Sequence, residues 1–133
     1  MRIHALLLLL IIVMTSIRSL TKTESLLGAW RLSSIDKKDN RYCIYEKVKQ
    51  LDDNSFGLQF LPKGKLRVCQ SKSWCPVGET TINFETVEGS WSMLNDSVVQ
   101  MQYPHFDSQV KDSRIVKWDD SNYLVLKRLR RFP

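Results

Sequence analysis

Residues 56–70 read FGLQFLPKGKLRVCQ and contain two alternating stretches separated by a turn sequence. Before the turn, Phe56, Leu58 and Phe60 alternate with small or polar residues, and after it charged residues alternate with apolar ones. A period of two is typical of a strand with one buried face, and the Pro-Lys-Gly sequence at 62–64 is typical of a tight turn. This stretch therefore predicts a β-hairpin.

The same pattern continues on both sides of the hairpin. Further strands are predicted at 28–35, 80–86, 89–94, 97–103, 112–118 and 122–129, whereas 42–51 fits either a helix or a strand. Asn95-Asp96 and Asp119-Asp120-Ser121 are turn signals, and Pro104 is expected to end a strand. Because long helical periods and βαβ units are missing from the pattern, we expect an all-β fold, a small up-and-down antiparallel β-barrel of about eight strands.

The N-terminus has the three parts of a secretory signal peptide. Residues 1–4 include one arginine, residues 5–14 (ALLLLLIIVM) are apolar without a break, and a more polar exit ends at Ser19. The apolar run is shorter than the roughly 20 residues that a membrane-spanning helix needs. We therefore expect a signal peptide at 1–19, a secreted or periplasmic protein and no stable membrane insertion, with an uncleaved anchor as the alternative.

Removal of residues 1–19 leaves 20–133, the size of a single domain that folds without a metal. The formal net charge is +6, but its sources are uneven. Arg2 and Arg18 lie in the leader, and four more basic residues lie in the last seven positions, which leaves 14 basic against 14 acidic residues. These four are Lys127, Arg128, Arg130 and Arg131. A neutral body with a basic C-terminal tail does not predict nucleic-acid binding.

Several motifs resemble those of the lipocalins and the wider calycin superfamily. Gly28-Ala29-Trp30 is similar to the Gly-x-Trp opening of the first lipocalin strand. Later segments resemble, in the same order, a group of small exported lipocalin-like proteins: Cys43, Phe56-Gly57-Leu58-Gln59-Phe60 with Gly64, Ser73-Trp74-Cys75-Pro76, Ile82, Gly89-Ser90-Trp91 and Asn122–Lys127. The resemblance spans 27–129 and departs at 76–79, where Pro-Val-Gly-Glu replaces a glycine and a proline pair.

This resemblance implies a role for the barrel interior. In lipocalins the motif tryptophan closes one end of the barrel under a basic residue from the last strand, which here would be Trp30 under Lys127, Arg128 or Arg130. The resemblance further implies a small apolar ligand in the interior, or at the open rim near Trp74. The ligand-binding candidates are Trp30, Phe56, Phe60, Trp74, Ile82 and Trp91. The alternative is that these side chains simply fill the core, because eight short strands leave room only for side chains or one small ligand.

The mature chain has three cysteines, and an exported protein favours one disulfide with one thiol left over. The spacing of Cys69 and Cys75 allows a bridge that closes a short loop. The resemblance instead implies a disulfide between Cys43 and Cys75. Cys69 would then share the polar strand face with Lys65 and Arg67, away from the core.

Candidate catalytic and metal sites are weak. His105 is the only histidine after the leader, no pair of cysteines has metal-ligand spacing, and His105 follows Pro104 where a solvated turn is expected. Asp52-Asp53 and Asp119-Asp120 lie in turn sequences, where aspartate makes local hydrogen bonds. We therefore expect no enzyme activity, no metal and no cofactor. The best hypothesis is an exported lipocalin-like protein that binds a small apolar ligand, and the alternative is a filled barrel that serves as a structural or protein-interaction module.

Overall fold

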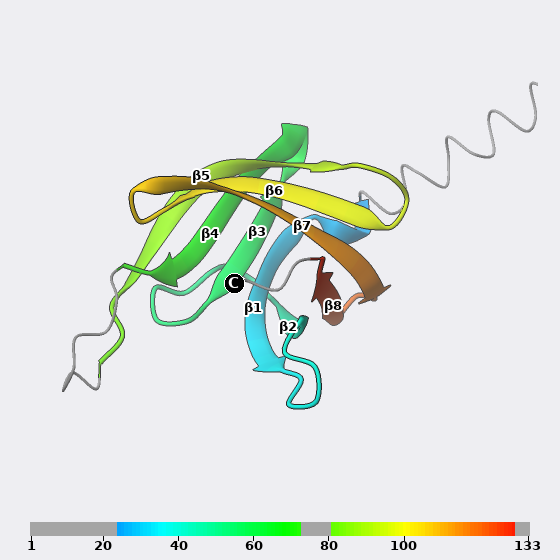
Figure 1. Ribbon diagram of the computed structural model, residues 1–133, viewed down its shortest axis with the longest axis horizontal. Helices are drawn as coiled ribbons and strands as arrows, with labels where there is room; N and C mark the ends of the chain where they lie inside the picture. The colour runs from blue at the N-terminus through cyan, green and yellow to red at the C-terminus, as the bar shows by residue number, and fades with distance from the viewer. Residues whose placement is uncertain (1–23, 73–80, 130–133) are drawn as a thin grey trace, which may run out of the picture.

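The computed structural model describes residues 24–72 and 81–129 as a closed antiparallel β-barrel (Figure 1). Its strands are β1 (Gly28–Ile35), β2 (Tyr42–Val48), β3 (Gly57–Leu61), β4 (Lys65–Ser71), β5 (Phe84–Met93), β6 (Val98–His105), β7 (Ser108–Asp119) and β8 (Tyr123–Arg128). A short 3-10 turn, η1 (Pro62–Gly64), joins β3 to β4 as the sequence predicts. The all-β barrel expected from the alternating pattern is confirmed.

Some strand boundaries differ from the expected ones. The ambiguous segment 42–51 forms a strand, and the two short strands expected at 80–86 and 89–94 are one strand, β5. Pro104 does not end its strand, because β6 continues to His105. The ladder between β5 and β6 covers only residues 99–102 of β6, so Pro104 lies beyond it, with β7 as its paired neighbour. A proline, which lacks an amide hydrogen, is tolerated in such a position.

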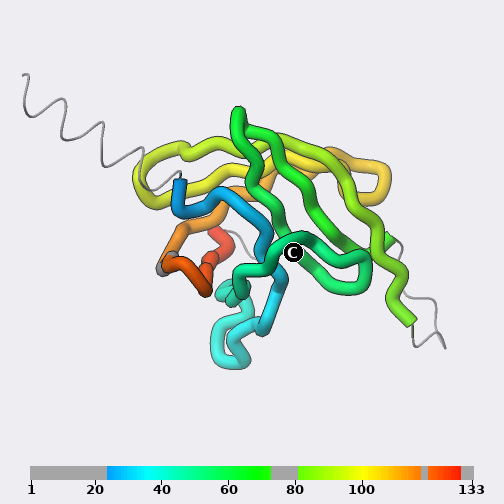
Figure 2. Tube along the Cα trace, turned by 180° about the vertical axis from the view of Figure 1, so that it is seen from behind, coloured from blue at the N-terminus to red at the C-terminus, as the bar shows by residue number. Residues whose placement is uncertain are grey.

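The strand order departs from a simple meander at one place. From β3 to β8 each strand pairs with its neighbour in sequence, but β1 lies between β2 and β3, and β2 closes the barrel against β8. Because β2 and β3 are both antiparallel to β1, they run parallel to each other. The connection between them, residues 49–56, therefore has to return along the length of β1, and it can be followed in Figure 2. We call this segment the crossover loop.

One end of the barrel is tightly packed. The start of β1 lies at this end together with the end of β3, the end of β5 and the start of β8. Its side chains form much of the main core and include the buried residues Leu26, Trp30, Phe60, Leu66, Trp91, Val99, Met101 and Leu124. The rings of Phe60 and Trp91 meet edge to face with centroids 5.2 Å apart. We call this region the packed end.

Both Gly-x-Trp tryptophans belong to the packed end and donate their indole hydrogens to backbone carbonyls. Trp30 Nε1 donates to Leu26 O at 2.8 Å, and Trp91 Nε1 donates to Leu61 O at 3.0 Å. The glycine at position 89 is required by packing, because a Cβ on Gly89 would lie 2.0 Å from the carbonyl oxygen of Gln102. These motifs therefore close one end of the barrel.

The basic residue over Trp30 is not the one expected. Lys47 of β2 places its Nζ 4.4 Å from the centre of the Trp30 ring and donates a hydrogen bond to Leu27 O at 2.6 Å. Lys127 instead lies over the ring of Tyr42, so its assignment to Trp30 is wrong, and Arg128 lines the opposite end of the barrel. Gly28 has a φ of +120° and leaves the space through which Lys47 reaches the ring. The closing role of Trp30 stands, but its cover comes from β2.

Candidate functional site

The end of the barrel opposite Trp30 contains a cavity of about 500 Å³. It is formed where β1 and β4 end and where β3 and β7 begin. Its lining comprises Leu32, Cys43, Tyr45, Phe56, Gly57, Leu58, Val68, Cys69, Gln70, Tyr103, His105, Val110, Arg114 and Arg128. A volume of this size lies in the range of small-molecule sites. The barrel is therefore filled at one end and hollow at the other.

The predicted ligand-binding residues are divided between these two ends. Phe56 lines the cavity, whereas Trp30, Phe60 and Trp91 belong to the packed end. Ile82 lies just before β5 with 44% of its surface exposed. Trp74, like Cys75, lies outside the described residues. Strand alternation indicates which side chains point inward, but it carries no information on their depth along the barrel, so it grouped residues from opposite ends.

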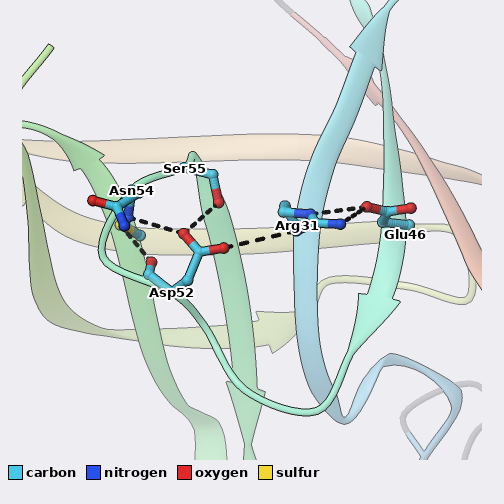
Figure 3. A network of polar contacts seen from close by, with 6 residues as sticks. Arg31, Glu46, Asp52, Asn54 and Ser55 are labelled. Atoms are coloured by element: carbon cyan, nitrogen blue, oxygen red, sulfur yellow. Dashed lines mark hydrogen bonds and ion pairs between the residues drawn. The ribbon is translucent and has the colours of Figure 1, made fainter. Parts of the chain in front are cut away.

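The crossover loop contributes Phe56 to the cavity lining. Asp52 of this loop is linked to Arg31 of β1 in an ion-pair network (Figure 3). Arg31 Nε donates to Glu46 of β2 at 2.8 Å, and the same guanidinium lies 3.8 Å from a carboxylate oxygen of Asp52. The other carboxylate oxygen of Asp52 accepts hydrogen bonds from Asn54 N and Ser55 Oγ, at 2.9 and 2.8 Å. These hydrogen bonds lower the pKa of Asp52, and they confirm the local role expected for an aspartate in this turn.

Cys69 has a different environment from the one expected. It does share the outward face of β4 with Lys65 and Arg67, but only 1% of its surface is exposed, because the crossover loop covers it. Its thiol donates to Asp52 O at 3.5 Å. Burial raises the pKa of Cys69, which disfavours the reactive thiolate. Its outward face was correctly predicted, but its burial under the crossover loop was not.

Cys43 is also buried, on the cavity side of β2. Within the described part of the chain, Cys43 and Cys69 are both free thiols. Because Cys75 falls outside that part, the disulfide between Cys43 and Cys75 stays a prediction.

The deeper wall of the cavity contains a buried arginine. Arg114 of β7 is 4% exposed, and its Nη1 donates to the hydroxyl of Tyr45 at 2.7 Å. Its Nε and Nη2 both contact a carboxylate oxygen of Asp112, at 2.9 and 2.8 Å. Burial acts to lower the pKa of Arg114, but the neighbouring Tyr45 and Asp112 outweigh it and raise this pKa. The sequence analysis did not identify Arg114. The available signal was its position, because an even-numbered spacing along the strand places Arg114 on the same inward face as Val110 and Val116.

Two tyrosines accompany this arginine. Burial raises the pKa of Tyr45, and it raises the pKa of Tyr103 to about 12. Both hydroxyls therefore carry their proton at neutral pH and can donate hydrogen bonds. Arg128 lies on the same lining, so two guanidinium groups face this part of the cavity, and the carboxylate of Asp112 pairs with the first of them. Positively charged side chains therefore contribute to the wall at this depth.

His105 does not lie in a solvated turn, so that expectation is wrong. It is the last residue of β6, it is half-buried, and it lines the cavity at its mouth. Its Nδ1 lies 3.0 Å from Oε1 of Gln70, a buried side chain of β4. Its ring also lies 4.2 Å from that of Phe106, centre to centre. The longer β6–β7 hairpin accounts for the difference, because it carries His105 into the barrel wall.

Neither a metal site nor a membrane-spanning helix occurs among residues 24–72 and 81–129. No group of three or more His, Cys, Asp or Glu side chains there could hold a metal ion. No helix in those residues has the length and apolar character that crossing a bilayer requires. No protein-family model, curated protein or solved structure matches the chain.

Proposed function

We propose that this protein binds a small, largely apolar molecule with one acidic group in the open end of its barrel. The observation that carries the proposal is the guanidinium of Arg114, buried on the wall of a 500 Å³ cavity whose other inward residues include Leu32, Leu58, Val68 and Val110. Burying a charge is costly, and an arginine with one carboxylate partner keeps donors for a second anion. The apolar wall would hold the body of the ligand.

In this proposal the protein is an exported, non-catalytic binding protein of lipocalin-like architecture. The leader sequence supports export, and the closed eight-stranded barrel with Trp30 at its packed end supports the likeness. The position of β1 between β2 and β3 distinguishes it from the up-and-down order of lipocalins. The alternative of a filled interaction module fits the packed end but leaves the cavity without a role.

Paired probes test the acidic group. Lauric acid and lauryl alcohol share an alkyl chain and differ in charge. The affinity of each is measured by displacement of a fluorescent fatty acid, and the difference between the two affinities gives the contribution of the carboxylate. We expect the acid to bind about tenfold more tightly, because a charge-assisted hydrogen bond is roughly twice as strong as a neutral one. Equal affinities, or no saturable binding of either probe, would contradict the proposal.

Variants then assign the effect to Arg114. The double variant Arg114→Gln with Asp112→Asn removes both charges and avoids an unpaired carboxylate in the barrel. It should lose most of the preference for the acid over the alcohol. Arg67→Gln provides a matched control, because Arg67 lies on the outward face of β4 and is exposed, so it should leave the preference for the acid unchanged.

A further inference from the structure

The orientation of the Gln70 side chain is fixed by its neighbours. Gln70 is 5% exposed, and its Nε2 lies 2.9 Å from Pro104 O and 3.4 Å from a carboxylate oxygen of Glu85. A backbone carbonyl can only accept a hydrogen bond, so the amide nitrogen of Gln70 has to face Pro104. Its oxygen, Oε1, consequently faces His105.

This orientation in turn fixes the tautomer of His105. Oε1 of Gln70 can only accept, and it lies 3.0 Å from Nδ1 of His105, so Nδ1 carries the hydrogen. A neutral imidazole has one N–H, which leaves a lone pair on Nε2. Contact with the Phe106 ring, which is tilted by 50° to the imidazole, restrains the rotation of His105. His105 therefore offers a hydrogen-bond acceptor at the cavity mouth.

The acceptor on His105 is well separated from Arg114. His105 pairs with Ser108, and Arg114 follows Ser108 by six residues along β7, which corresponds to about 20 Å between the two backbone levels. The side chain of Arg114 leans toward Asp112, so the polar groups are closer than this. Val110 lines the cavity between the two levels. The cavity is thus polar at both ends of an apolar wall.

We propose that His105 is a specificity-determining residue that selects ligands carrying a hydrogen-bond donor, such as a hydroxyl, at the end remote from their acidic group. The inference rests on the proposed function and names its ligand class as hydroxylated amphipathic acids. The neutral histidine accepts a hydrogen bond from the hydroxyl through Nε2, while Arg114 holds the acid.

The test compares three ligands of one chain length by displacement of a fluorescent fatty acid from the full mature protein. Lauric acid has no second polar group, ω-hydroxylauric acid can donate, and ω-methoxylauric acid can only accept. At about pH 8 we expect the hydroxy acid to bind several-fold more tightly than the methoxy acid.

Substitutions separate recognition from structure. His105→Phe should remove the hydroxyl preference, whereas His105→Gln supplies an amide oxygen as the acceptor and should keep the preference. Lys111→Gln, an exposed site on the same hairpin, serves as the control and should behave like the wild type. Melting curves identify any variant that has lost its fold.

Three results would overturn the inference. Equal affinities for the hydroxy and methoxy acids at about pH 8 would do so, as would a preference that survives His105→Phe. If lauric acid binds, and the hydroxy and methoxy acids bind with equal affinity, only the role of His105 fails. If none of the three acids binds, the proposed function fails with it.

Discussion

Nζ of Lys47 lies 4.4 Å from the centre of the Trp30 ring and 2.6 Å from the carbonyl oxygen of Leu27, so one ammonium group joins β2 to the packed end. Burial lowers the pKa of Lys47 because it disfavours the charged ammonium group. The Trp30 ring and the Leu27 carbonyl offset part of this desolvation penalty. The contact explains why a glycine with a positive φ precedes Ala29 and Trp30, because any side chain at Gly28 would meet Lys47.

Replacing Lys47 should weaken the packed end. We expect Lys47→Met to lower the free energy of unfolding by about 1–2 kcal/mol, the sum of a cation–π contact and a hydrogen bond. Urea denaturation followed by tryptophan fluorescence measures this loss. Lys127→Met is the matched control, since Lys127 lies over Tyr42 instead, and an equal loss in both variants would contradict the assignment of Lys47 to Trp30.

Phenylalanine truncations should differ at the two ends of the barrel. Phe60 is 1% exposed against Trp91, so Phe60→Ala should cost about 3–5 kcal/mol of stability through lost contacts and a cavity. Phe56 lines the existing cavity and is 39% exposed, so Phe56→Ala should cost much less. Comparable losses in the two denaturation curves would mean that the open end is packed in solution.

Alkaline pH should destabilise the barrel through Tyr103. Burial raises the pKa of Tyr103 from 10.0 to about 12, so between these values the unfolded chain has released the phenolic proton while the folded chain keeps it. Stability is therefore present below about pH 10 and is lost as pH rises toward 12, by about 2–3 kcal/mol. Tyr103→Phe should flatten this part of the stability curve, and an unchanged curve would show that other groups cause the loss.

Cys69 should react slowly with alkylating reagents while the crossover loop is in place. Its thiol is buried against Asp52, and its raised pKa reduces the thiolate fraction further. Arg31→Ala removes the ion pair that attaches the loop to β1 and should speed alkylation of Cys69, as followed by peptide mass spectrometry. Lys49→Ala, an exposed site at the start of the same loop, should leave the rate unchanged.

The same peptide maps, taken without reduction, test the disulfide. We expect Cys43 joined to Cys75 and Cys69 recovered as a free thiol. A bridge between Cys69 and Cys75 would refute this pairing.

The barrel and most of its hairpins could be predicted because they depend on local signals. The alternation that places Leu58 and Phe60 on one face marks the inward side of β3, and Asn95 and Asp120 accept backbone hydrogen bonds in the turns where they were expected. The position of β1 between β2 and β3 could not be predicted, because strand order depends on pairing between distant segments. The same limit hid the site, since nothing near Arg114 in sequence shows that Tyr45 is its partner.

The order of the strands has a consequence for a chain that is incomplete. Because β2 pairs with β8, Tyr42 finds its partner in Lys127, 85 positions later (127 − 42). A truncated chain that lacks β8 leaves β2 and β7 with open hydrogen-bonding edges, which are templates for intermolecular pairing. The six-residue strand β8 therefore closes the barrel. A nascent chain stays prone to aggregation until β8 has been synthesised and has paired with β2 and β7.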